Sequence, residues 1–380
     1  MDGQPTLTCQ SALLTLPMES TQRVVLEGVR AISGSRHSRG SLRRAVSCAI
    51  GAVLGLSAAR ADTVWVRRVD GGLEERHGQI VEYRGDLLVL KRSAVRTERI
   101  AADRIDRIEA RYGTRHVQAE AAFARHDYDR ARQLFQEAMA TESREWVQRA
   151  ELARIIQCDW NLGRDTQAAQ QFLVLLRSDP TLLHWEAAPL HWQAQPLTAS
   201  QRRWAQEHLQ DQTFAAVRLV AASWLLAGSE RPRALEQLKD LAESGDAKIR
   251  FLARAQQWRV RWPGIKAPPV EEAAETLTAV DQRLRKGPCF LIAEAHARAA
   301  EKEDAVLWWL RVGLLYPHDA RLAATALWRA GKQLEQSGRH PEARRLYYEI
   351  LQRYPTRPEA ARARKQLEPQ AANQKKANPS

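Results

Sequence analysis

Residues 327–355 read LWRAGKQLEQSGRHPEARRLYYEILQRYP, and this stretch decides the fold that we expect. Gly331 in its first half and Ala343 in its second are small residues that let two helices approach closely. The aromatic Tyr347 follows Ala343 and can fill the space against a neighbouring pair of helices. Pro355 ends the stretch, and proline cannot continue a helix. The stretch therefore predicts a helical hairpin.

The same pattern, a small residue followed four positions later by an aromatic one, recurs along the chain. The pairs are Ala131 and Phe135, Ala168 and Phe172, Ala305 and Trp309, and Ala343 and Tyr347. The first two pairs are 37 residues apart and the last two 38, near the ~34-residue period of the tetratricopeptide repeat. The chain resembles that family over roughly 115–180 and 288–368. The resemblance implies an α-solenoid, in which these pairs, Gly331 and Pro355 serve packing rather than ligand contact.

A looser repeat lies between these blocks. Residues 217–221 and 249–253 share the order β-branched, Arg, apolar, any residue, Ala, and resemble HEAT-type helical repeats. The proline-rich run that follows Trp262 interrupts the helical pattern. We expect helical repeats over 114–262, a linker over 263–269, tetratricopeptide-like repeats over 270–368 and a disordered tail over 369–380.

Residues 62–112 show a β pattern. Apolar residues alternate in short runs, and the turn signal at Gly85 separates two of them. The spacing resembles small SH3-like or Sm-like barrels in outline, on Gly78, Ile80, Gly85, Leu88 and Leu90. Sm-like barrels can bind RNA, but no strand face here combines basic and aromatic residues, so we expect a capping or docking module. The predicted fold is mostly α, a solenoid preceded by a small barrel-like β module.

Residues 1–61 resemble a leader with a signal peptide. An uncharged, largely apolar stretch over 45–59 follows a basic flank, and Ala59-Arg60-Ala61 fits the small-x-small rule for signal peptidase. The stretch is shorter than the ~20 residues that span a bilayer, which favours cleavage after Ala61 and export to the periplasm. The alternative is an inner-membrane anchor formed by 45–59. Membrane contact is expected only through this segment, if it stays uncleaved.

The net charge and the absence of enzyme motifs reduce the number of functions that we expect for this chain. The chain has 380 residues, with 58 Lys and Arg against 45 Asp and Glu, a net charge of +13. The positive charges are interspersed with acids instead of clustered, which makes nucleic acid an unlikely partner. No phosphate-binding loop, nucleophile elbow or zinc-protease motif is present in the sequence. We therefore expect a protein without enzymatic activity, without a bound cofactor and without a metal site. Cys158 and Cys289 are expected as buried free thiols, with a bridge between them as the alternative.

Tryptophan supplies the candidate contact residues. Trp185, Trp192 and Trp204 surround a predicted helix connection, and we expect them to form a surface patch that contacts a partner. The leading hypothesis is a non-enzymatic scaffold of the bacterial cell envelope that binds a protein or peptide. One alternative is a nucleic-acid-binding protein that uses the basic surface and an Sm-like barrel. Another is a protein that binds or processes cell-wall sugar.

Overall fold

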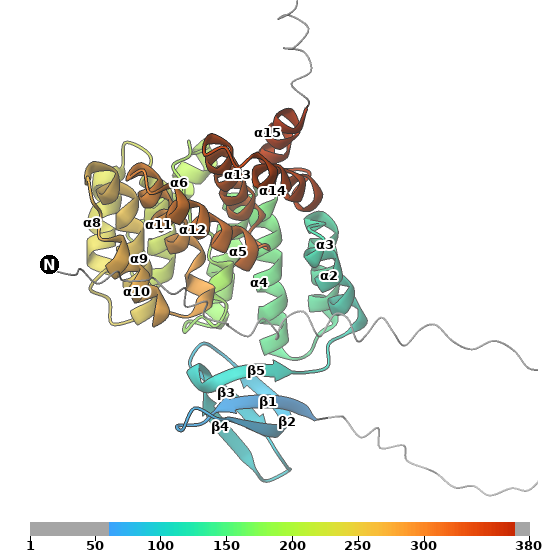
Figure 1. The fold of residues 1–380 in the computed structure, drawn as a ribbon. Helices are drawn as coiled ribbons and strands as arrows, with labels where there is room; N and C mark the ends of the chain where they lie inside the picture. Colours follow the sequence, from blue (N-terminus) through green and yellow to red (C-terminus); the bar gives the residue numbers. More distant parts are fainter. Residues whose placement is uncertain (1–60, 369–380) are drawn as a thin grey trace, which may run out of the picture.

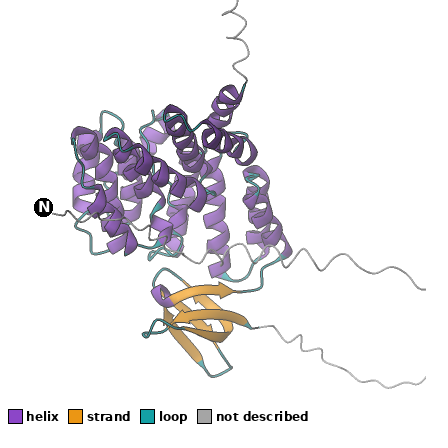
Figure 2. Ribbon diagram, in the orientation of Figure 1, coloured by secondary structure: helices purple, strands orange, loops and turns teal. Residues whose placement is uncertain are grey.

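The computed structural model describes residues 61–368, which form a small sheet followed by a helical body (Figure 1). In the described part of the chain, all strands precede all α-helices (Figure 2). The predicted leader and signal segment, apart from Ala61, and the predicted tail over 369–380 lie outside the described residues. No helix in the described part of the chain is long and apolar enough to cross a membrane.

Five strands form one antiparallel sheet of order β4-β3-β2-β1-β5. Within β1 and β3, Val64, Val66, Leu88 and Leu90 are buried while their neighbours face outward, as the two-residue period of a strand requires. A tight turn joins β1 to β2 at Gly71, whose φ of 84° suits glycine. The elements are β1 (Asp62–Arg67), β2 (Leu73–Tyr83), β3 (Leu87–Lys91), β4 (Thr97–Ala101), the 3-10 turn η1 (Ala102–Arg104) and β5 (Ile105–Glu109).

Fourteen α-helices follow in the residues that the structure describes, and most of them pack on the next helix along the chain. The first eight are α2 (Thr114–Ala124), α3 (Tyr128–Thr141), α4 (Glu145–Asn161), α5 (Asp165–Ser178), α6 (Ala199–His208), α7 (Ala215–Leu225), α8 (Arg231–Leu241) and α9 (Ala247–Arg261). The others are α10 (Val270–Thr278), α11 (Lys286–Arg298), α12 (Lys302–Leu315), α13 (Ala320–Gln336), α14 (His340–Arg353) and α15 (Pro358–Leu367). Single 3-10 turns are η2 (Trp185–Ala187), η3 (Trp262–Gly264) and η4 (Gln282–Leu284).

Side-chain caps fix where several helices begin. Asp127 accepts a hydrogen bond from the backbone of Arg130 at the start of α3, and Asp319 accepts one from Leu322 at the start of α13. Thr198 and Gln201 form a complete capping box at the start of α6. These caps satisfy backbone donors that the first helical turn leaves free, so each helix has a defined first residue.

The predicted packing residues lie in the helical interior, with one exception. Ala131, Phe135, Ala168, Phe172, Ala305, Trp309, Gly331, Ala343 and Tyr347 are buried, whereas Pro355 is exposed just beyond the end of α14. At Gly331 a Cβ would lie 2.6 Å from a Tyr347 ring carbon, so α13 and α14 are in close contact there. Residues on both sides of the predicted linker over 263–269 belong to one hydrophobic core. Cys158 and Cys289 are buried free thiols, which excludes the bridge between them.

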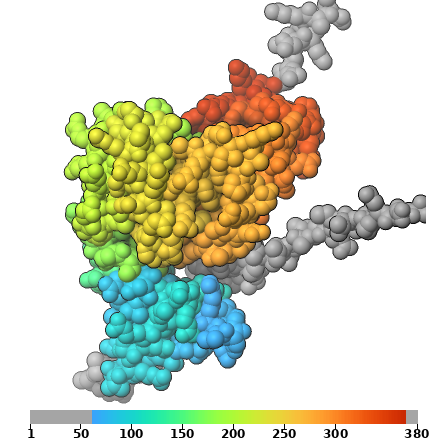
Figure 3. All heavy atoms as spheres, turned by 90° about the vertical axis from the view of Figure 1, so that its left-hand side faces the viewer, coloured from blue at the N-terminus to red at the C-terminus, as the bar shows by residue number. Residues whose placement is uncertain are grey.

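A buried interface joins the sheet to the helical body (Figure 3). Trp146 and Val147, at the start of α4, belong to the hydrophobic core of the sheet. The Trp146 indole donates a hydrogen bond to the Ile80 carbonyl at 3.2 Å. A second contact lies at Gly85, where a Cβ would overlap the backbone of Thr181. The sheet is therefore a docked module that lacks a complete core of its own.

Two ends of the helical body meet at what we call the closure contact. It joins the α2–α3 turn and the end of α4 to the segments before α13 and after α14. The His126 ring donates to the Arg353 carbonyl at 2.5 Å and stacks on Tyr354 with ring centroids 4.9 Å apart. The Asn161 amide donates to the His318 carbonyl at 3.0 Å. The partners are 227 and 157 residues apart in sequence, so the two ends of the helical region lie together.

We expect Gly287→Ala to lower the free energy of unfolding by about 1–3 kcal/mol, because overpacking a filled core forces side chains to shift. Gly287 lies in the first turn of α11, where a Cβ would overlap ring carbons of the buried Trp192. Urea unfolding measures the effect. The matched control is Gly264→Ala, since nothing lies within 4 Å of a Cβ at that position. Equal stability of the two variants would show that Trp192 does not pack here.

Candidate binding groove

Two adjoining cavities form a groove along one side of α13. They share the lining residues Gln193, Thr325 and Glu359, so they lie next to each other. We call the smaller one, of about 190 Å³, the inner cavity, and the larger one, of about 500 Å³, the outer cavity. The walls come from α4, the segment before α6, α12, α13 and α15. The groove therefore depends on the contact between the early and late helices.

One face of α13 forms the floor of the groove. Arg321, Thr325 and Arg329 follow each other at four-residue spacing, and Trp328 and Lys332 continue the same stripe. Residues four apart lie above one another on a helix, so the stripe is continuous. The opposite face of α13 carries small and apolar residues that are buried in the core. This division is the ordinary amphipathic pattern of a helix at a surface.

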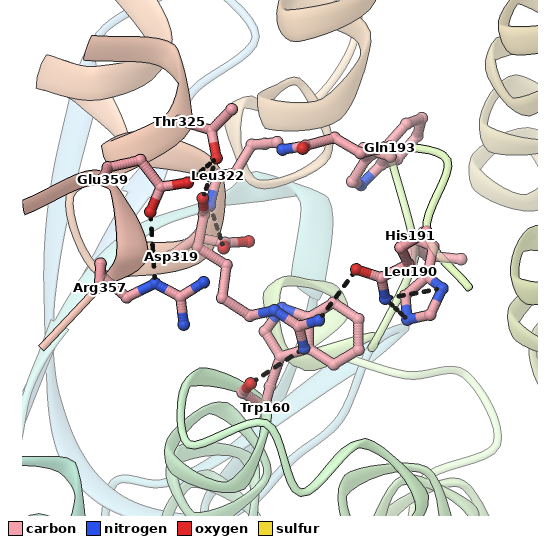
Figure 4. A pocket seen from close by; sticks show the side chains of 12 residues that line it. Trp160, Leu190, His191, Gln193, Asp319, Leu322, Thr325, Arg357 and Glu359 are labelled. Atoms are coloured by element: carbon pink, nitrogen blue, oxygen red, sulfur yellow. Dashed lines mark hydrogen bonds and ion pairs between the residues drawn. The ribbon is translucent and has the colours of Figure 1, made fainter. Parts of the chain in front are cut away.

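The inner cavity contains a guanidinium group that forms no hydrogen bond with any other residue of 61–368. Arg357, immediately before α15, projects toward the cavity from one side (Figure 4). Its Nε lies 3.9 Å from a carboxylate oxygen of Glu359, which is an ion pair but too long for a hydrogen bond. The other Glu359 oxygen accepts a hydrogen bond from Thr325 at 3.1 Å. Burial is the main cause of a lowered pKa at Arg357.

A buried network holds the second guanidinium group, that of Arg321. Asp165 at the start of α5 accepts hydrogen bonds from Arg321 at 2.6 Å and from Gln201 at 2.8 Å. The His191 ring lies 3.3 Å from the same carboxylate. The Arg321 guanidinium also lies over the Trp160 ring, 4.1 Å from its centroid. Arg321 is therefore fixed by contacts with α4 and α5, although it belongs to α13.

The network shifts the pKa values of Asp165 and His191. Burial acts to raise the pKa of Asp165, but the hydrogen bond from His191 and the charge of Arg321 outweigh it, and the pKa lies below its ordinary value. Burial lowers the pKa of His191 to about 4, so its imidazole is neutral near pH 7. Asp165 thus carries the negative charge that compensates Arg321.

The outer cavity combines aromatic and cationic side chains. Trp309 and Trp328 contribute indole rings to its walls. Arg329 pairs with Glu294 at 2.6 Å, outside the lining. Arg362 on α15 is exposed and, within residues 61–368, forms no ion pair. This end of the groove therefore offers apolar surface beside an uncompensated positive charge.

The tryptophans that we expected at a surface patch lie in the core instead, which corrects that prediction. Trp185, Trp192 and Trp204 are each 5% exposed. The chain between α5 and α6 folds into the helical body, so Trp192 packs against Gly287. Trp204 belongs to α6 and lies on Trp224 with ring centroids 5.0 Å apart. Of the three, Trp192 also lines the inner cavity.

Sequence reasoning missed the polar residues of the groove. Arg321 and Arg357 are two of many arginines, and no local pattern distinguishes them. The heptad-like spacing of polar residues along α13 was the available signal, but it is also typical of a solvated helix face. Trp309, which we assigned to repeat packing, is buried as expected and also lines the outer cavity.

The groove has the features of a ligand-binding site, since its walls combine hydrogen-bond donors, indole rings and positive charge. Within residues 61–368 no group of three or more potential metal ligands is found. Comparisons with family models, with curated proteins and with solved structures found no match for this chain.

Proposed function

We propose that the protein is a non-enzymatic scaffold that binds a segment of a partner polypeptide in the groove along α13. The single observation that carries this is that the inner and outer cavities adjoin along α13 and share three lining residues, which favours an elongated site over an isolated pocket. In this proposal the helical body is an α-solenoid of tetratricopeptide-like hairpins. Such arrays commonly present extended binding surfaces and carry no chemistry of their own.

The groove chemistry supports a polypeptide ligand with acidic residues. The amides of Gln193, Gln333 and Gln336 can both donate and accept, as the backbone of an extended peptide requires. Trp309 and Trp328 provide apolar contact for side chains. The uncompensated charge of Arg362 favours carboxylates on the ligand, which would also speed association.

The sheet supports the scaffold in this proposal as a docking module that braces α4. Trp146 ties the sheet core to the same helix whose other end carries Trp160 in the wall of the inner cavity. The proposed location is the periplasm. It rests on the apolar stretch over 45–59 and the small-x-small site that ends at Ala61.

The test compares charged peptides on wild type and two arginine variants. Fluorescein-labelled pools of acidic, basic and neutral decapeptides are titrated with the protein, and fluorescence anisotropy gives the Kd. We expect the acidic pool to bind most tightly. We expect Arg362→Glu to raise that Kd about tenfold, since a reversed charge repels the ligand. The matched control is Arg364→Glu, an exposed residue of the same helix that lines neither cavity.

Two results would contradict the proposal. One is an acidic pool that binds no better than the basic pool. The other is an equal loss of affinity in the Arg362 and Arg364 variants, which would indicate bulk charge instead of a groove. A labelled single-stranded RNA belongs in the same series. Tighter binding of RNA than of any peptide pool at about 0.2 M salt would favour nucleic acid as the ligand.

A further inference from the structure

Arg357 presents an unusual surplus of hydrogen-bond donors inside a cavity. Its guanidinium carries five N–H donors. No hydrogen bond from any of them to another described residue is present, and its Nε is buried. A buried donor without a partner costs free energy, about 1–3 kcal/mol in typical cases. The side chain projects into the inner cavity (Figure 4).

Further donors line the same cavity. Arg321 borders it from α13, and only its Nε–H remains without a partner among the described residues, because its other N–H groups donate to Asp165, Trp160 and Gln195. The amide of Gln193 adds another donor at the junction with the outer cavity. These donors come from three separate parts of the chain, which the fold brings to one cavity.

Two carboxylates line the cavity, and one oxygen of Glu359 forms no hydrogen bond with a described residue. Asp319 pairs with Lys286 at 2.8 Å and caps the start of α13. Glu359 accepts a hydrogen bond from Thr325 and faces Arg357 at 3.9 Å. Lys286 compensates the charge of Asp319, and Glu359 faces Arg357 without accepting a hydrogen bond from it, so the Arg357 N–H donors have no partner among the described residues.

We propose that the inner cavity binds an oxyanion, a carboxylate or phosphate group, at the guanidinium group of Arg357. The inference rests on the proposed function, since the anion would be carried by the polypeptide that occupies the outer cavity. A volume of about 190 Å³ holds a few water molecules, each of about 30 Å³, and so has room for one such group. Planar guanidinium groups bind both anions through paired hydrogen bonds.

Small anions test the pocket separately from the peptide. Inorganic phosphate and acetate are titrated into the full chain by calorimetry, with sodium chloride holding the ionic strength constant. We expect at least one of the two to bind and to raise the melting temperature. The tighter of the two identifies the anion class. We expect Arg357→Gln to raise its Kd about tenfold, as the loss of a charge-assisted hydrogen bond predicts.

Two further variants keep the test decisive. Arg364→Gln, on α15 outside the groove, is expected to bind like wild type. Arg357→Lys retains the charge without the planar fork, and we expect an intermediate Kd. The proposal fails if neither anion binds wild type, or if Arg357→Gln binds as tightly as Arg364→Gln.

A competition experiment separates this inference from the proposed function. The anion that binds is added to the complex of the protein with the labelled acidic pool. We expect displacement, because the anion and the acidic group of the peptide would share the inner cavity. If the anion binds without displacing the peptide, the inner cavity does not hold the acidic group of the peptide, and this inference is overturned. Anion binding together with no peptide binding would instead contradict the proposed function alone.

Discussion

Replacing Asp165 with Ala is expected to lower the free energy of unfolding by about 3–5 kcal/mol, the cost of removing one partner of a buried ion pair. Asp165 is 3% exposed and accepts hydrogen bonds from Arg321 and Gln201. Without it, the Arg321 guanidinium would remain largely buried beside Trp160 with no compensating charge. Urea unfolding followed by tryptophan fluorescence measures the loss. We also expect weaker peptide binding, because Arg321 would no longer be fixed in the groove.

The matched control is Asp129→Ala. Asp129 also pairs with an arginine, Arg164, at 2.8 Å, but the two side chains are 67% and 42% exposed. A surface pair contributes about 1 kcal/mol or less. If the two alanine variants lost the same stability, the network around Asp165 would not join α5 to α13 as described.

Replacing Trp146 with Ala is the second large change, with an expected loss of about 3–5 kcal/mol. Trp146 is 3% exposed, belongs to the sheet core and donates a hydrogen bond to the Ile80 carbonyl. Its removal leaves a cavity between α4 and the sheet and an unpaired carbonyl. Hydrogen exchange should show faster exchange in the strands than in α11 to α14, because the sheet loses its contact with the helical body.

Trp65→Ala provides the comparison. Trp65 is in β1 of the same sheet, but it is only partly buried and the Arg107 guanidinium covers its ring at 4.1 Å. It is not part of the sheet core. We expect a loss well below that of Trp146→Ala. A larger effect at Trp65 would mean that the sheet is stabilised mainly by its outer face, with little support from α4.

Local signals in the sequence predicted the elements of the fold well. The turn signal at Gly85 lies between β2 and β3. Gly331, for which we predicted a packing role, lies against Tyr347 where α13 meets α14. Both depend on residues that are near each other in sequence. Turn chemistry and helical periodicity act at that range, which is why they could be recognised.

The path of the chain between α5 and α6 could not be predicted in the same way. Trp185 and Trp192 stand in a loop-like segment, and a loop is normally on the surface. Their burial depends on the helices that surround them, including Gly287 from a distant part of the chain. The closure contact is a similar case, since His126 meets Arg353 across 227 residues.

The candidate groove was beyond sequence reasoning for the same reason. Arg321 is held by Asp165, which lies 156 residues earlier in the sequence. Arg357 differs from other arginines because its buried Nε has no hydrogen-bond partner among the described residues. Neither property has a local signature in the chain. A stripe of polar residues on a helix is equally consistent with solvent, so α13 alone could not identify a binding surface.

Site-specific photo-crosslinking tests the central claim, that a polypeptide binds along α13, most directly. A photoreactive phenylalanine analogue replaces Gln336, which is exposed in the outer cavity, or Gln352, which is exposed on α14 away from the groove. After irradiation with the labelled acidic pool, the yield of crosslinked protein is measured for each. The account predicts a high yield at position 336 and a background yield at 352. Equal yields, or a higher yield at 352, would contradict it.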